Sequence, residues 1–503
     1  MTAISTLEDL LVGLRAQFDV QRAAVHAHPM PSADERVDRI NRLIAIMTGD
    51  AREIVDAIVA DYGSRSHVQS IMTEVLGPLP SITHTRRHVA SWMKPRRAWA
   101  GPLGLLGGRA SVEWQPLGVV GIISTWNFPV GTTFVPAAQA FAAGNHVMLK
   151  LSEDVPNTAA VLRSAIAREF DPAELVAVTG GPEVGEAFAS LPFDHLLLTG
   201  STATGRLVQR AAAVNLTPVT LELGGRCPVV VGSGADMSKV ADRIMAGKTI
   251  NSGQLCFAPN HVYVREGRER DFVAAVRASV RRMYPTMLDN DDYTSIINER
   301  HYQRLMGYLE EAQAKGAEII EINPAGEDFT DQPAHKIPVM LVLGADPSMS
   351  VLREELFGPV LPVLTYGELR EPIEEINRGD KPLAAYWFGS DPAERRLFLD
   401  RTSSGGVTLD DVILHYTVDD IPFGGVGASG TGAYHGRWGF ERFSHARSIL
   451  RAPRRFSANS LMAAPFGQRF RKITDWLVRH EARVVGKRLA RDEARREAAK
   501  QRR

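Results

Sequence analysis

The chain has 503 residues and no formal net charge, and 44% of its residues are hydrophobic and 23% charged. This length exceeds one ordinary core and leads us to expect about three domains, while the composition excludes a mainly disordered chain. The two cysteines, Cys227 and Cys256, are too few for a disulfide framework or a multi-thiolate zinc site.

Cysteine usage and the N-terminal sequence predict a cytoplasmic protein. So few cysteines fit a reducing compartment. Residues 1–21 carry Glu8, Asp9 and Arg15 among apolar residues, without the basic segment, apolar core and cleavage site of a secretion signal. No apolar run in the sequence is long enough to cross a bilayer.

Residues 5–95 are expected to be mostly helical. Apolar residues recur there at spacings of three and four, as in Ile40, Leu43 and Met47. Ser32 followed by Glu35 makes a capping box, which predicts a helix start. We interpret this segment as scaffold.

An alternation of apolar strands and helices follows. We expect strands at 110–115, 118–123, 147–151, 175–178 and 195–199, with helices at 158–169 and 184–191. A second α/β stretch runs from about 228 to about 406, with helices at 237–251, 270–283 and 298–315. This pattern is typical of parallel sheets buried on both faces, which bind nucleotides at the carboxyl ends of their strands.

Residues 454–503 form a basic tail, with twelve Arg and three Lys against two Asp and three Glu. Phe470, Leu477 and Val484 recur at helical spacing, which favours a helix with one apolar face. Gly486 and the Arg-rich end favour partial disorder instead. A packed helix and a membrane-surface or partner helix both remain open, while the absence of an aromatic-interleaved patch disfavours nucleic-acid binding.

Two motifs at expected strand ends suit a nucleotide. Thr199-Gly200-Ser201 opens a helix whose backbone N–H groups suit a pyrophosphate, although the glycine spacing up to Gly205 does not match Gly-x-Gly-x-x-Gly. Lys150 and Glu153 can reach ribose hydroxyls, and a carboxylate there favours NAD over NADP. The alternative for this pair is an ordinary solvated loop.

Three residues suit covalent chemistry. Cys256, in Gly253-Gln254-Leu255-Cys256, is a candidate nucleophile or else a small core residue. The amide of Asn127 can donate to an oxyanion or else form an Asx-turn. Glu222 ends an apolar strand, where desolvation should raise its pKa towards that of a general base, unless it turns to solvent.

These motifs, in this order, resemble the aldehyde dehydrogenase superfamily over roughly residues 5–450. The resemblance is carried by 126–129, Lys150 with Glu153, 199–201, 221–225, 253–256 and 355–359. Residues 291–298, 422–427 and 432–436 are most similar to the coniferyl aldehyde dehydrogenases of the class 3-like branch. The implied α/β fold has a Rossmann-type parallel-sheet cofactor domain, an α/β catalytic domain and a small β oligomerisation region.

The resemblance also implies a mechanism. Cys256 attacks an aldehyde, the Asn127 amide and the Cys256 N–H hold the oxyanion, and Glu222 activates the water that hydrolyses the thioester. The implied cofactor is NAD, with NADP as the alternative, and no metal is needed. The implied cofactor-binding residues are Trp126, Lys150, Glu153, Thr199, Gly200, Ser201, Gly205, Leu223, Glu355 and Phe357.

The expected organisation follows from the same resemblance. We expect N-terminal helices and a cofactor domain at 1–95 and 114–222, a catalytic domain at 223–406, an oligomerisation region at 96–113 and 407–450, and the tail at 451–503. The implied partners are a small-molecule aldehyde, a second copy in a homodimer, and a weak membrane-surface or partner contact through the tail, with no nucleic acid.

Departures from the family pattern leave every reacting group in place. Arg226-Cys227 stands where Lys-Ser is usual, Leu151 where Pro is common, and Leu255 and Phe257 are larger than the usual neighbours of the nucleophile. The alternatives to an aromatic aldehyde substrate are a fatty or aliphatic aldehyde, a cofactor-independent thiol esterase activity, and a non-catalytic binding protein on this fold.

Overall fold

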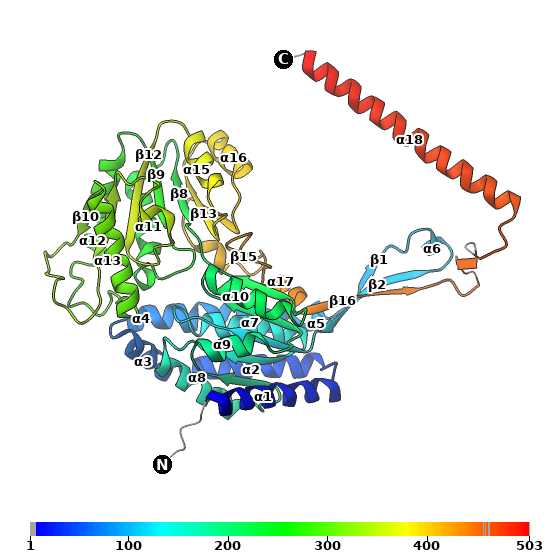
Figure 1. Ribbon diagram of the computed structural model, residues 1–503, viewed down its shortest axis with the longest axis horizontal. Coiled ribbons are helices and arrows are strands. Elements are labelled where there is room, and N and C mark those ends of the chain that lie inside the picture. The colour runs from blue at the N-terminus through cyan, green and yellow to red at the C-terminus, as the bar shows by residue number, and fades with distance from the viewer. Residues whose placement is uncertain (1–6, 456, 458, 461–462, 502–503) are drawn as a thin grey trace. The chain divides into compact units, whose positions relative to one another are not determined.

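A computed structural model describes residues 7–455, 457, 459–460 and 463–501. The chain forms two compact units (Figure 1). One unit comprises the chain up to Lys94 together with Glu113–Arg447, and the other comprises Pro95–Val112 together with the chain from Ser448.

A six-stranded sheet organises the first half of the larger unit. Its strands are β3 (Val119–Ile123), β4 (His146–Lys150), β5 (Leu175–Val178), β6 (His195–Thr199), β7 (Val219–Glu222) and β15 (Gly430–Thr431). The order is β15-β7-β6-β3-β4-β5, and all neighbours are parallel except β15 with β7. From β3 the sheet extends to one side through β4 and β5 and to the other side through β6 and β7. The strand order thus changes direction between β3 and β6, and parallel sheets bind ligands in the crevice at such a switch point.

Helices cover both faces of this sheet because successive strand residues point to opposite sides. Val120 and Ile122 pack on one face, while Val119 and Ile123 pack on the other with the helices α1, α9 and α10. The helices here are α1 (Leu7–Ala27), α2 (Ala33–Gly49), α3 (Ala51–Tyr62), α4 (His67–Ser70), η1 (Ile71–Leu76), α5 (Pro78–Trp92), α7 (Gly131–Ala143), α8 (Pro156–Glu169), α9 (Pro182–Ala189), α10 (Thr202–Ala213) and α17 (Gly436–Arg442). The predicted capping box of Ser32 and Glu35 at the start of α2 is confirmed.

A seven-stranded sheet organises residues 228–409. Its strands are β8 (Pro228–Val231), β9 (His261–Arg265), β10 (Glu318–Ile322), β11 (Val339–Leu343), β12 (Val360–Tyr366), β13 (Ala384–Phe388) and β14 (Gly406–Leu409), in the order β10-β11-β12-β9-β8-β13-β14. Only β10 pairs antiparallel. The expected α/β class with mostly parallel sheets is confirmed.

The second sheet is also covered on both faces. Apolar side chains of α11 and α12 pack on one face, and those of α13, α15 and α16 on the other. The helices of this part are α11 (Met237–Lys248), η2 (Ile250–Gly253), α12 (Glu269–Met283), α13 (Glu299–Ala314), α14 (Ser350–Arg353), α15 (Arg370–Arg378), α16 (Pro392–Arg401) and η3 (Leu414–Thr417). The division into cofactor and catalytic domains stays a prediction.

A three-stranded sheet has the order β1-β2-β16. The elements here are β1 (Arg96–Ala98), α6 (Pro102–Leu105), β2 (Arg109–Pro116), β16 (Ser444–Arg451) and α18 (Gln468–Gln501). Helix α18 continues through Gly486, and nearly all of its described side chains are exposed. The expected disorder at Gly486 is therefore wrong, because the many Ala, Arg, Glu and Lys residues of α18 offset the roughly 1 kcal/mol that one helical glycine costs.

Candidate active site

The chemistry-bearing residues of both halves of the larger unit meet at one cavity. Asn127 follows β3, while Thr199 ends β6 and pairs in register with Glu222 at the end of β7. Cys256 enters from the loop after η2. These four residues line a cavity of about 690 Å³. The crevice that the strand order predicts is therefore the place where these side chains lie together.

The loop before Cys256 has an unusual backbone that its own side chains hold. Asn251 and Ser252 have φ values of 49° and 50°, in the left-handed region that non-glycine residues avoid. The side-chain amide of Gln254 donates to the carbonyls of Asn251 and Ser295, each at 2.9 Å, and accepts from the N–H of Ile297 at 3.0 Å. Such over-determination is what allows a strained turn to persist at a functional site.

The two thiols have different surroundings. Burial raises the pKa of Cys256 well above its usual value, and the neighbouring Glu355, Cys227 and Glu222 raise it further. The Cys256 side chain is half-buried and lines the cavity, so it is a protonated but reachable thiol. Cys227 is fully buried, and burial raises its pKa to about 12. Of the two, only Cys256 suits nucleophilic chemistry.

Glu222 is a buried carboxyl group without a hydrogen-bond partner. Its side chain is 3% exposed, and neither carboxylate oxygen has a partner in the described structure. Burial raises its pKa well above the usual value, against a smaller opposing effect of Arg442. The predicted rise in pKa is confirmed, and the alternative of a side chain turned to solvent is wrong.

Asn127 joins the two halves of the site. Its side-chain Nδ2 donates to the carbonyl of Gln254 at 3.1 Å, and the residue is 3% exposed. One N–H of the amide remains for another acceptor, because a carboxamide nitrogen carries two. The side chain is thus held against the nucleophile loop instead of forming the alternative Asx-turn.

The start of α10 suits the phosphates of a dinucleotide. Residues 199–203 line the cavity, and the Ser201 side chain accepts from the Thr204 N–H at 3.1 Å as the helix N-cap. Thr199 Oγ1 is buried without a partner. Backbone N–H groups and the helix dipole at such an end attract phosphate. Gly205 and Leu223 do not line the cavity but contact each other. A Cβ on Gly205 would lie 2.8 Å from the Leu223 side chain, so the glycine allows α10 to pack closely against the end of β7.

Glu355 and Phe357 form another wall of the cavity. Burial raises the pKa of Glu355 to about 7, and its Oε1 has no partner. A Cβ at Gly224 would lie 2.1 Å from the Glu355 carboxylate, so this glycine makes room for the acid. The Phe357 ring meets Trp126 edge-on at 5.3 Å. An acid with one free carboxylate oxygen and an aromatic wall fit the ribose and nicotinamide of NAD(P).

Lys150 and Glu153 are placed differently from the other expected cofactor residues. They pair with each other at the end of β4 and are absent from the lining of the cavity. The Lys150 side chain is 5% exposed, whereas that of Glu153 is 42% exposed.

Comparison with known proteins decides the family. Residues 15–449 match the model of the Aldehyde dehydrogenase family. A "Probable coniferyl aldehyde dehydrogenase" of Caulobacter vibrioides is 48% identical over 90% of this chain and 94% of its own length, and a "Coniferyl aldehyde dehydrogenase" of Pseudomonas sp. is 48% identical over 86% and 89%. The chain belongs to the aldehyde dehydrogenase family. The solved "Substrate bound state of Staphylococcus Aureus AldH" superposes with a TM-score of 0.86 at 32% identity, covering 92% of this chain and 99% of that one. This protein is an NAD(P)-dependent aldehyde dehydrogenase.

The aldehyde dehydrogenase has an aromatic end to its cavity that sequence reasoning missed. The Phe257 ring stacks on Tyr416 at 5.4 Å and meets Phe423 edge-on at 5.4 Å. Tyr434 lines the same region, and His301 packs on Trp126 elsewhere in the cavity. Residues 413–434 carry no motif whose spacing indicates that they fold over Cys256, so only the size of Phe257 pointed to this wall.

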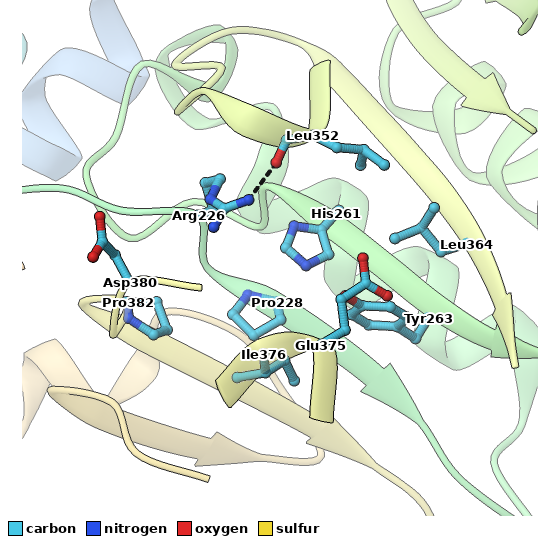
Figure 2. Close-up of a pocket in the computed structure, with 10 residues that line it drawn as sticks. All are labelled: Arg226, Pro228, His261, Tyr263, Leu352, Leu364, Glu375, Ile376, Asp380 and Pro382. Carbon is cyan, nitrogen blue, oxygen red and sulfur yellow. Dashed lines mark hydrogen bonds between the residues drawn. The ribbon is translucent and has the colours of Figure 1, made fainter. Parts of the chain in front are cut away.

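Arg226, one of the departures from the family pattern, lines the large cavity of the enzyme and also a small one of about 30 Å³, which Figure 2 shows. Its guanidinium donates to the carbonyl of Leu352. Burial, with a smaller effect of Arg226, lowers the pKa of the adjacent His261 to about 3, so this histidine is neutral. Arg226, at the edge of both cavities, thus has a backbone carbonyl as its partner.

The described residues of the enzyme include neither a cluster of metal-binding side chains nor a helix that could span a membrane. No group of three or more His, Cys, Asp or Glu side chains among them is arranged to hold a metal ion. Within that same part of the chain, no helix has both the length and the apolar character needed to cross a bilayer.

Proposed function

We propose that this enzyme oxidises an aromatic, coniferyl-type aldehyde to its carboxylic acid, with NAD as the preferred cofactor. The observation that carries the proposal is that Cys256, Asn127 and Glu222 share one cavity whose wall next to Cys256 is formed by Phe257 and Tyr416. Planar aromatic walls favour a planar aromatic substrate. The names of the two relatives at 48% identity support the same substrate class.

The first half of the proposed mechanism forms the carbon–sulfur bond. Glu222 as carboxylate takes the proton of the Cys256 thiol, and the sulfur adds to the aldehyde carbon. The free N–H of the Asn127 amide and the backbone N–H of Cys256 stabilise the resulting oxyanion, whose collapse expels the hydride. NAD(P), when bound, supplies the acceptor for that hydride.

The second half hydrolyses the thioester that remains on Cys256. Glu222 first releases the thiol proton to solvent and becomes a carboxylate again. It then takes a proton from a water molecule, and the hydroxide adds to the thioester carbon. The tetrahedral oxyanion uses the same two donors. Release of the acid restores the Cys256 sulfur, so one carboxyl group serves both halves of the reaction.

The proposed cofactor contacts follow the walls of the cavity. The N-terminus of α10, with Thr199, Gly200 and Ser201, would hold the pyrophosphate, and Glu355 the nicotinamide ribose. Lys150 and Glu153 would bind the adenosine ribose, and a carboxylate there disfavours a 2′-phosphate. Glu153→Gln should therefore raise kcat/KM for NADP relative to NAD, and an unchanged ratio would remove Glu153 from cofactor selection.

One panel tests the substrate. Reduction of NAD and NADP is measured with coniferaldehyde, benzaldehyde and long-chain aliphatic aldehydes, using the parent and Cys256→Ala. We expect the highest kcat/KM with coniferaldehyde for the parent, and no reduction of NAD or NADP by Cys256→Ala. Turnover of aliphatic aldehydes alone would favour the fatty aldehyde alternative. Ester hydrolysis without cofactor and without aldehyde oxidation would favour a thiol esterase.

We also propose a homodimer that forms through the smaller unit. Trp99, Leu105 and Leu106 are 86%, 89% and 55% exposed there, which is unusual for large apolar side chains. Burial of these side chains against a second copy would remove that surface from water. Light scattering of the parent and of a Trp99→Ser/Leu105→Ser variant tests this, and an unchanged mass of one chain in both would exclude it.

Two further proposals concern location and the tail. The low cysteine content supports a cytoplasmic location.

Helix α18 combines many Arg side chains with exposed Ile473, Trp476 and Leu489, which supports weak binding to an anionic surface. Cosedimentation with vesicles containing phosphatidylglycerol, compared with phosphatidylcholine vesicles, tests the membrane contact.

A further inference from the structure

A fully buried ion pair lies behind the oxyanion residue, in a segment that the sequence presents as scaffold. Arg65 follows α3 and Glu74 lies in η1, and both side chains are 0% exposed. Arg65 Nη2 and Glu74 Oε1 are 3.0 Å apart. Neither side chain lines the cavity around Cys256, so neither can touch a substrate there.

The pair binds both ends of the turn that carries Asn127. Arg65 Nη1 donates to the backbone carbonyl of Asn127 at 3.0 Å. Glu74 Oε2 accepts from the N–H groups of Val130 at 3.1 Å and Gly131 at 3.4 Å. The turn leading into α7 is thereby fixed from the carbonyl of Asn127 to the first residue of the helix.

Two further donors reach the same carbonyl. Tyr62 Oη lies 3.4 Å from it, and Asn251 Nδ2 lies 3.2 Å from it and 3.3 Å from the carbonyl of Gln254. Asn251 is one of the two left-handed residues of the nucleophile loop. The ion pair, the oxyanion residue and the nucleophile loop therefore belong to one continuous set of hydrogen bonds.

Stability alone does not explain such a pair. Removing two charges from water costs several kcal/mol per ion, and apolar replacements of buried pairs are often neutral or stabilising. A fixed turn, in contrast, has a direct effect on catalysis. An oxyanion donor must lie within about 0.5 Å of its working position, and a displacement of about 1 Å can lower the rate roughly 100-fold.

We infer that Arg65 and Glu74 are positioning residues, whose ion pair holds Asn127 where its amide can reach the oxyanion on Cys256. The inference rests on the proposed role of Asn127. Loss of the pair lets the 127–131 turn relax, which weakens transition-state stabilisation and leaves substrate and cofactor binding nearly intact. Arg65→Met and Glu74→Gln should therefore lower kcat at least tenfold, with KM changing less than threefold.

A double-mutant cycle on the full chain separates this role from a structural one. Coupled residues give non-additive effects, whereas independent ones add. Arg65→Met should lower kcat in the parent but have little effect in Asn127→Ala, because the donor that it positions is already absent. Thermal stability should fall equally in both backgrounds.

The control is a second largely buried pair away from the cavity. Arg39 Nε and Glu174 Oε1 are also 3.0 Å apart, and the Arg39 side chain is 6% exposed. Arg39→Met should lower Tm and leave kcat within about twofold of the parent. Should Arg65→Met fail to fold, Arg65→Lys takes its place in the same cycle, since Lys keeps the charge and loses the planar fork that reaches two acceptors.

The outcomes distinguish this inference from the proposed function. If Asn127→Ala keeps the parent kcat, the proposed oxyanion role itself is wrong. If Asn127→Ala is impaired and Arg65→Met lowers kcat by the same factor in both backgrounds, or if Arg39→Met lowers kcat as much, the positioning role is wrong. Lower kcat that disappears in Asn127→Ala supports it.

Discussion

Asn127 donates its side-chain amide to the carbonyl of Gln254, two residues before Cys256, across a distance of 3.1 Å. The first residue follows a strand of one sheet, and the second lies in a loop that precedes a strand of the other. Through this bond the position of the oxyanion donor depends on the shape of the loop that carries the nucleophile.

Gln254→Leu should therefore impair catalysis without contacting substrate. The side chain of Gln254 makes three hydrogen bonds that hold the left-handed backbone at Asn251 and Ser252. Their loss should lower kcat by about 100-fold, because the thiol and the oxyanion donor no longer share one geometry. Steady-state kinetics and the rate of Cys256 alkylation by iodoacetamide measure this.

The control for Gln254→Leu is Gln139→Leu, which removes another fully buried amide, next to Thr85. This substitution should lower stability and leave kcat near that of the parent. Equal kcat in Gln254→Leu and the parent would show that the loop holds its shape without these bonds.

Glu222 should determine the acid limb of the pH profile. Burial raises its pKa, and the proposed base must be ionised, so kcat/KM should rise with pH through that raised value. Glu222→Gln should lower kcat by about 100-fold or more, because both the Cys256 thiol and the hydrolytic water lose their base. Pre-steady-state kinetics measure the formation and the hydrolysis of the thioester separately. A parent-like acid limb in Glu222→Gln would assign that limb to another group.

The raised pKa of Glu222 should also make the folded protein less stable as the pH rises. When the pKa of a carboxyl is higher in the folded state than in the unfolded state, the unfolded chain releases the proton first. The free energy of unfolding therefore falls as the pH rises from the unfolded-state pKa of about 4.3 through the folded-state pKa. Glu222→Gln removes this loss. Its Tm should therefore exceed that of the parent at neutral and alkaline pH, and equal Tm values across the range would contradict the burial of an unpaired acid.

Sequence reasoning predicted the sheets and the residues at their strand ends, because apolar runs separated by helices and residues such as Thr199 and Glu222 are local signals. It also gave the direction of the Glu222 pKa, since a carboxyl inside an apolar strand has few alternatives. It could not find Arg65 and Glu74. Apart from each other, their partners are backbone atoms more than fifty residues away, and a backbone partner leaves no trace in residue type.

The aromatic wall was missed for a related reason. The size of Phe257 is evident in the sequence, but its contacts with Tyr416 and Phe423 join segments about 160 residues apart. The tail differs from expectation in the opposite direction. Gly486 and the two valines before it disfavour a helix, but the Ala-, Arg-, Glu- and Lys-rich sequence around them has high helix propensity, and α18 runs through all three.

The two cysteines should differ in reactivity within the folded protein. Cys227 is 0% exposed, and burial raises its pKa to about 12, whereas Cys256 lines the cavity. Iodoacetamide should add to one thiol and abolish activity. The Cys256→Ala variant should not be labelled, whereas the Cys227→Ala variant should be labelled like the parent. Mass spectrometry of tryptic peptides measures the labelling. Labelling of Cys227 at a comparable rate would mean that the core around it opens readily.

Phe257→Leu should change which aldehyde the enzyme prefers. The substitution keeps an apolar side chain beside Cys256 but removes the ring that stacks on Tyr416 at 5.4 Å. Aromatic contacts of this kind contribute roughly 1 kcal/mol beyond their buried area, so kcat/KM for coniferaldehyde should fall by about fivefold to tenfold. The value for an aliphatic aldehyde of similar length should change less, because that substrate gains nothing from a ring. Phe170→Leu, which removes a ring stacked on Phe141 at 5.7 Å within the N-terminal half, should lower stability alone. An equal loss for both aldehydes in Phe257→Leu would show that this wall supports the nucleophile loop and does not select the substrate.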